Sequence, residues 1–295
     1  YDQIARDMLL DSRLEVIMGC GHPLFGKGGE PLDTNANYKY VGGKETWEDL
    51  LGGKVEYRNA SPSGNSQVQD ANGDGTPDVW TLVQDKDGFL KLASGPTPVR
   101  VLGVAPVAST LQQERPGDGM APAFGVAFTP GLPDLKDMTM AAVNVLDNDP
   151  DGFFLMVEGG AIDWASHDNQ TGRMIEEMDD FNRAVDALIQ WVETNSSWEE
   201  TLLIVTGDHE CGYLTGPAEE AGYSAQLPVV NNGKAVMPGV QWNHTNHTNQ
   251  LIPFYARGAG SERALLFADE IDPVRGKYLN NTELAQWVML LWDSL

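Results

Sequence analysis

Short apolar runs alternate with amphipathic helical segments along this chain, and several of the runs end in glycine together with acidic residues or histidine. The runs are typical of buried strands and lie at 14–21, 99–105, 152–160, 201–210 and 247–258. The helical patterns between and after them cover 43–53, 134–146, 173–193 and 280–292. This alternation predicts an α/β protein with a mainly parallel sheet flanked by helices, in which ligands gather beyond the carboxyl ends of the strands.

The composition limits the classes of function. The 295 residues suffice for a substantial core, and 41% of them are hydrophobic. The formal net charge of -24 would repel nucleic acid and anionic lipid, and it favours cations. No apolar stretch is long enough to span a membrane. Only two cysteines, Cys20 and Cys211, are present, and we expect two unpaired thiols rather than one long-range disulfide.

Two of the predicted strand ends carry residue types that bind metals. The stretch EGGAIDWASH supplies Glu158, Asp163 and His167, and the stretch TGDHE supplies Asp208 and His209. The aspartate and histidine of the first stretch are four residues apart, so on a helical turn they share one face and can grip one zinc ion. Further histidines, in NHTNHTNQ, precede another predicted strand.

Each of these pairs has an ordinary explanation when it is taken alone. An Asp-x-x-x-His pair on a helix is often a cap or a surface pair, and an acid/base pair is another use of the same side chains. However, acids and histidines beyond several strands converge on one edge of a sheet. Because buried carboxylates need a partner, which a divalent cation supplies, the combined pattern favours a metal site.

Three motifs in fixed order give a more specific indication. FFLMVEGGAIDWASHDN, TLLIVTGDHECG and HTNQLIPFYARG resemble the C-terminal part of the alkaline phosphatase family, and LPDLKDMTMAAVNVL and IARDMLLDSRLEVIMGCG resemble earlier segments of that family. The resemblance covers most of the chain and makes residues 1–295 the C-terminal portion of one alkaline phosphatase-like domain. It implies a phosphomonoesterase with a three-layer α/β/α fold that binds two zinc ions and one magnesium ion.

The resemblance also assigns ligands position by position. It implies the following set: Asp163, His167 and His247 for the first zinc, Asp208 and His209 for the second, and Glu158 for the magnesium. His247 begins HTNQLIPF and matches the family form better than His244, which begins a similar HTN three residues earlier. Trp164 stands beside the zinc aspartate, where it would shape or cover the phosphate pocket.

One part of the family's active site has no counterpart in this sequence. The family carries a serine nucleophile in an Asp-Ser-Ala motif, an aspartate that bridges zinc and magnesium, and an arginine for phosphate. No Asp-Ser-Ala occurs here, since Asp11 and Ser12 continue into Arg13. The first residues, YDQIARDMLL, have the pattern of a helix already under way. We therefore expect a preceding segment of the same protein to supply the catalytic nucleophile, and none to lie in this chain.

A second cation site is predicted in the stretch DANGDGTPD. Oxygen ligands alternate along it as in an EF-hand-type calcium loop, at Asp70, Asn72, Asp74, Thr76 (through its carbonyl) and Asp78. The glutamate expected at the twelfth position is absent, because Thr81 stands there, so a turn that binds no ion is the alternative. The stretch belongs to a segment of about 55–130 that we expect to be an acidic, loop-rich insertion.

A separate fragment that binds metal without turnover stays open as a hypothesis, and so do two functions of other kinds. One is another metal-dependent phosphohydrolase of the same superfamily, such as a phosphodiesterase or a mutase. The other is a calcium-stabilised extracellular binding module without turnover, which the acidic charge and the Asp70 stretch would suit. The resemblance to alkaline phosphatases further implies small phosphomonoester substrates, a homodimer, and a periplasmic or secreted location.

Overall fold

The computed structural model describes residues 1–10, 14–54, 70–218 and 227–292. The chain divides into two compact units. The first unit contains Tyr1–Trp164 and Thr171–Ala187, and the second contains Ala165–Gln170 and Leu188–Leu295. Among the described residues, every helix is too short or too polar to cross a membrane.

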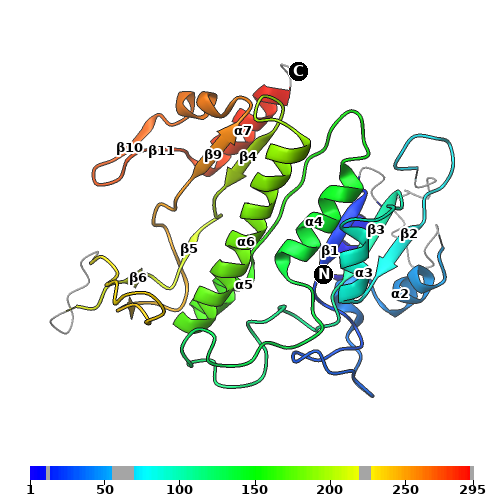
Figure 1. Ribbon diagram of the computed structural model, residues 1–295, viewed down its shortest axis with the longest axis horizontal. Helices are drawn as coiled ribbons and strands as arrows, with labels where there is room; N and C mark the ends of the chain where they lie inside the picture. Colours follow the sequence, from blue (N-terminus) through cyan, green and yellow to red (C-terminus); the bar gives the residue numbers. More distant parts are fainter. Residues whose placement is uncertain (11–13, 55–69, 219–226, 293–295) are drawn as a thin grey trace. The chain divides into compact units, whose positions relative to one another are not determined.

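The first unit is built on a three-stranded parallel sheet (Figure 1). Its strands are β1 (Val16–Gly19), β3 (Arg100–Val104) and β2 (Trp80–Val83), in the spatial order β1-β3-β2. Val101 of the middle strand pairs with Val16 on one side and with Thr81 on the other. Every residue of β3 is buried, as expected for the central strand of a sheet that is covered on both faces.

Helices cover both faces of this sheet. On one face, Leu102 and Val104 pack with residues of α1 (Asp2–Leu10), the 3-10 helix η1 (Tyr38–Val41) and α2 (Lys44–Leu51). On the other face, Val101 packs with residues of α3 (Lys86–Leu92) and α4 (Leu135–Leu146). Successive residues of β3 therefore enter opposite cores, which follows from the period of two in a strand. The first unit is a three-layer α/β/α sandwich, as the sequence predicts.

Most elements of the first unit lie where the sequence places them, and one detail differs. The helix predicted at 134–146 is α4, and Asp134 caps it through a capping box with Asp137. Helix α2 follows Gly43 without a side-chain cap, although a threonine stands in its first turn: the Thr46 hydroxyl donates to the carbonyl of Gly42. The segment of about 55–130, expected to be loop-rich, contains β2, α3 and β3; its residues 55–69 lie outside the described part.

Residues 152–160 depart from the prediction of a strand. They precede α5 (Ala161–His167), and none of them belongs to a strand. The side chains of Phe154 and Met156 are 66% and 77% exposed. An apolar run becomes a strand only where a neighbouring backbone accepts and donates its hydrogen bonds, so the sequence pattern alone was not sufficient here.

The second unit consists of short antiparallel pairs and helices. The strand pairs are β4 (Leu202–Val205) with β9 (Tyr255–Gly258), β5 (Glu210–Cys211) with β8 (His247–Thr248), β6 (Leu214–Thr215) with β7 (Gln241–Trp242), and β10 (Glu270–Asp272) with β11 (Gly276–Tyr278) (Figure 1). Its remaining elements are the C-terminal part of α6 (Thr171–Asn195), the 3-10 helix η2 (Ser261–Leu266) and α7 (Asn281–Trp292). The strands predicted in 201–210 and 247–258 and the helices at 173–193 and 280–292 are confirmed.

Candidate metal centre

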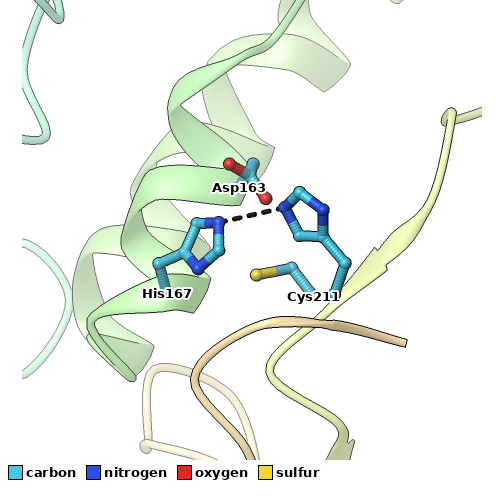
Figure 2. Close-up of side chains that lie close together, drawn as sticks. Asp163, His167 and Cys211 are labelled. Atoms are coloured by element: carbon cyan, nitrogen blue, oxygen red, sulfur yellow. Dashed lines mark hydrogen bonds between the residues drawn. The ribbon is translucent and has the colours of Figure 1, made fainter.

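Helix α5 carries the first two predicted ligands. Gly159 and Gly160 precede the helix, and the amide of Ile162 donates to the carbonyl of Gly159, which starts the first turn. Asp163 lies in the first turn and His167 in the last, so the two side chains stand one above the other on a common face (Figure 2). A carboxylate oxygen of Asp163 lies within 4.8 Å of a ring nitrogen of His167.

The imidazole of His167 is held in one orientation. Its Nδ1 lies 2.6 Å from the carbonyl oxygen of Thr245, and because a carbonyl only accepts, Nδ1 carries the proton and donates it. The lone pair of the neutral ring is then on Nε2, which lies 3.0 Å from Nε2 of His247. A histidine that donates one ring N–H to a backbone carbonyl and presents the other nitrogen is the usual arrangement of a metal ligand.

The orientation of His247 follows from the short β5–β8 ladder. In this antiparallel pair Cys211 is opposite His247 and Glu210 is opposite Thr248. Directly opposite residues project to the same face, and successive residues to opposite faces. One face therefore carries a thiol beside an imidazole, while on the other the Thr248 hydroxyl donates to the Glu210 carboxylate.

A glycine follows β5 for a steric reason. Gly212 has φ of 87°, in the left-handed region, and a Cβ there would lie 2.5 Å from ring atoms of Trp242. Its amide donates to the carbonyl of Asn246, and its carbonyl accepts from the amide of His244. These bonds hold the 243–248 segment against β5, which places His247 where His167 can meet it.

The second predicted pair, Asp208 and His209, lies beside this cluster in the second unit. The His209 ring stacks on the His247 ring, with centroids 3.5 Å apart and planes 23° apart. The two rings are therefore in face-to-face contact. Nδ1 of His209 is buried and has no hydrogen-bond partner among the described residues. Its Nε2 lies 3.4 Å from the exposed carboxylate of Asp208.

The other predicted site residues are placed differently. His244 turns back on its own loop, where its Nδ1 accepts from the amide of Asn246, so it is His247 that faces His167. In the first unit, Glu158 is exposed and the Trp164 side chain is 45% exposed. The structure thus brings His167, His209 and His247 of the second unit together. Asp163 lies beside His167 because both residues belong to α5.

Cys211 was missed by the sequence reasoning. Its sulfur, a nitrogen of His167 and a nitrogen of His247 all lie within 4.8 Å of one another, and Figure 2 shows the sulfur directed toward the His167 ring. Neither cysteine of the chain forms a disulfide, as predicted. The signal that could have found Cys211 is its position three residues after Asp208 in TGDHEC, combined with the pairing of β5 and β8.

The helix that follows α5 begins in a buried network of the first unit. Arg115 and Glu176, 1% and 3% exposed, form an ion pair at 2.8 Å. Glu176 also accepts from the amide of Phe124, and Arg173 donates to the carbonyls of Gln112 and Arg115. These contacts fix the irregular 112–128 segment against the start of α6.

Two titratable groups near this network are unsuited to carry charge. Burial, together with the carboxylates of Asp180 and Glu176, raises the pKa of Glu177 to about 7. Burial, with a further contribution from the Glu177 carboxylate, raises the pKa of the Cys20 thiol to about 12. Cys20 is therefore a protonated thiol at neutral pH, in contrast to a cysteine that binds metal.

The predicted calcium stretch forms a compact loop of the first unit. Asp70 accepts from the amides of Asp74 and Gly75, and Asp78 accepts from the amide of Ala71. Asp74 accepts from the amide of Thr76, and this bond is the main reason that its pKa lies below the usual range. The carboxylates are thus turned onto their own backbone, and calcium binding there stays a prediction.

The arrangement in the second unit fits a zinc-type ion. Two nitrogens bound to one tetrahedral zinc at 2.0–2.1 Å would be roughly 3.3 Å apart, close to the distance between the two Nε2 atoms. The chemistry of the donors, imidazole and carboxylate, is also that of zinc sites. The family sequence model described as "Alkaline phosphatase" matches residues 1–264.

The chain belongs to the alkaline phosphatase family.

Two curated relatives illustrate the range of similarity. Alkaline phosphatase 3 of Bacillus subtilis is 46% identical over 84 residues, which are 28% of this chain and 18% of that protein. The membrane-bound alkaline phosphatase of Bombyx mori is 30% identical over 182 residues, 62% of this chain and 28% of that protein. The chain therefore spans less than a third of the length of either relative.

Solved structures share the fold. A cold-active alkaline phosphatase from Shewanella sp. superposes with a TM-score of 0.59 at 20% identity, over 99% of this chain and 68% of that one. A variant of the TAB5 alkaline phosphatase with Mg bound in its M3 site gives a TM-score of 0.51 at 21% identity, over 88% of this chain and 58% of that one. At such identities the likeness establishes an alkaline phosphatase-like α/β fold.

Proposed function

We propose that this chain forms the metal-binding part of an enzyme that hydrolyses phosphate monoesters through a phosphoserine intermediate. The observation that carries the proposal is the facing of His167 and His247 at 3.0 Å, with Nδ1 of His167 fixed on the Thr245 carbonyl. Membership in the alkaline phosphatase family supports the reaction class. Since the chain holds no Asp-Ser-Ala, the serine would come from a segment outside it.

Each predicted ligand has a specific part in this proposal. Asp163, His167 and His247 would hold one zinc, Asp208 and His209 a second zinc, and Glu158 a magnesium. Bound zinc would supply Lewis-acid stabilisation of phosphoryl oxygens and a water of lowered pKa. The Thr245 carbonyl keeps the lone pair of His167 directed at the site, and the β5–β8 ladder does the same for His247.

The test compares the protein that contains this chain and its serine-bearing segment with its His167→Ala variant. We expect p-nitrophenyl phosphate hydrolysis to fall by more than about 100-fold, because even residues that only orient ligands are worth 10–100-fold. Zinc content, measured on the same samples, should fall by one ion per chain. Full activity and zinc content in the variant would refute the assignment of His167.

Substrate and metal profiles separate the competing functions. Faster turnover of bis(p-nitrophenyl) phosphate than of the monoester would indicate a phosphodiesterase, and calcium as the sole bound metal would indicate a binding module.

We also propose a homodimer in the periplasm or outside the cell, acting on small phosphomonoesters. The net negative charge of the chain would repel anionic phosphoesters unless bound cations offset it locally. Measuring the bound metals therefore also tests whether the protein can accept such substrates.

A further inference from the structure

Cys211 lies where a fourth donor to the His167–His247 ion would lie. The two-residue ladder of β5 and β8 sets Cys211 directly opposite His247, so their side chains project to one face. The sulfur, the His167 nitrogen and the His247 nitrogen lie within 4.8 Å of one another. Donors to a single zinc, with Zn–N of 2.0–2.1 Å and Zn–S near 2.3 Å, are roughly 3.5 Å apart. A shift of at most about 1.3 Å brings the sulfur into coordination distance.

The position of the thiol is imposed by the backbone and not by a flexible side chain alone. Gly212, with its positive φ, fixes the turn that follows Cys211, and its amide bonds to Asn246 on the opposite strand. The thiol therefore stays beside the two imidazoles as long as the ladder is formed.

We propose that Cys211 binds the same ion as His167 and His247, as a thiolate whose proton is released to solvent when the metal enters. This inference rests on the proposed function and adds a sulfur ligand to the nitrogen and oxygen ligands of that site. Thiolate favours zinc and other soft ions over magnesium, which prefers carboxylate and water. With Asp163, one helical turn before His167, the sulfur would make four protein ligands, and the water of the proposed function would add to the ion as a fifth.

Cobalt(II) is the probe that distinguishes this inference from the proposed function. The protein is stripped of metal by chelation and reloaded with cobalt(II). Intense visible bands report a tetrahedral ion on any ligand set, whereas a near-ultraviolet sulfur-to-cobalt charge-transfer band appears only with a thiolate ligand. We expect the wild type to show both. The Cys211→Ser variant should keep the visible bands, lose the charge-transfer band, and bind zinc about tenfold or more weakly, with magnesium binding unchanged.

The matched control is Cys20→Ser, which removes the buried thiol that is not part of the site and should leave both features unchanged. A charge-transfer band absent from the wild type, or retained in Cys211→Ser, overturns the inference while the visible bands keep the proposed function intact. Failure of the stripped wild type to take up cobalt(II) at all overturns both. X-ray absorption spectroscopy of the zinc-loaded wild type gives a test that does not depend on the folding of a variant. A sulfur neighbour near 2.3 Å from the zinc supports the inference, and a shell of nitrogen and oxygen alone contradicts it.

Discussion

The two units of this protein satisfy their polar side chains in different ways. In the first unit, the Glu176 carboxylate forms an ion pair with Arg115, and Asp70 accepts from the amides of its own loop. In the second unit, imidazole nitrogens of His167 and His247 face each other, and His209 has a buried nitrogen without a partner among the described residues. An acid and a base that pair with each other leave no place for a cation, whereas two neighbouring imidazole nitrogens can exchange their hydrogen bond for a shared metal ion. The predictions below test this difference, beginning with the largest effect.

Breaking the internal pairing of the first unit should be costly. Replacing Glu176 with leucine leaves Arg115 buried without its partner carboxylate, and we expect the free energy of unfolding to fall by about 3–5 kcal/mol. Urea denaturation measures the loss. The double variant Arg115→Met, Glu176→Leu should recover part of it, because it removes both charges of the pair but also the Arg115 donors to the carbonyls of Val126 and Ala127. A single variant as stable as the wild type would show that the pair does not hold the 112–128 segment.

The second unit should gain stability from zinc. An ion that binds only the folded state at 100 times its dissociation constant adds about 2.7 kcal/mol, seen as a rise in Tm. We expect this rise in the wild type and its loss in His247→Ala. The control is His244→Ala, which removes the neighbouring histidine that accepts from Asn246, and should keep the zinc response. If His244→Ala loses the response and His247→Ala keeps it, the zinc ligand is His244 and not His247.

These two histidines show how far the sequence could lead. The HTN register around His244 and His247 left the ligand to a resemblance, and only the β5–β8 pairing gives a physical reason for His247. In contrast, β3 and α4 were predictable from the sequence, because their apolar patterns and the Asp134 cap are local signals. Residues 152–160 and Cys211 were not, because a strand partner and a neighbour across a ladder are set by distant parts of the chain.

Glu177 offers an effect with a defined pH dependence. Its pKa, about 7 in the folded protein against an ordinary 4.5, is raised by burial, so the folded state holds a proton that the unfolded chain releases. The resulting stability is fully present below pH 4.5 and is lost as pH rises through 7. We expect the Tm of Glu177→Gln, measured in thermal melts, to change less with pH between 4.5 and 7 than the Tm of the wild type. An unchanged pH profile would show that Glu177 is not the group responsible.

The smallest effect is expected at the Asp70 loop. A weak calcium site occupied at twice its dissociation constant would add about 0.6 kcal/mol. Calcium should therefore raise the Tm of the wild type slightly and not that of Asp78→Asn, whose loop keeps the amide contacts of Asp70 and Asp74. A Tm independent of calcium would mean that the loop is held by its own hydrogen bonds and binds no ion.

The most direct test of the central claim is a crystal structure of the zinc-soaked protein with anomalous data collected at the zinc edge. We predict a peak within about 2.0–2.1 Å of both His167 Nε2 and His247 Nε2, with Nδ1 of His167 still on the Thr245 carbonyl. A map in which these two nitrogens bind different ions, or in which zinc occupies other sites and leaves them in contact with each other, would contradict the account.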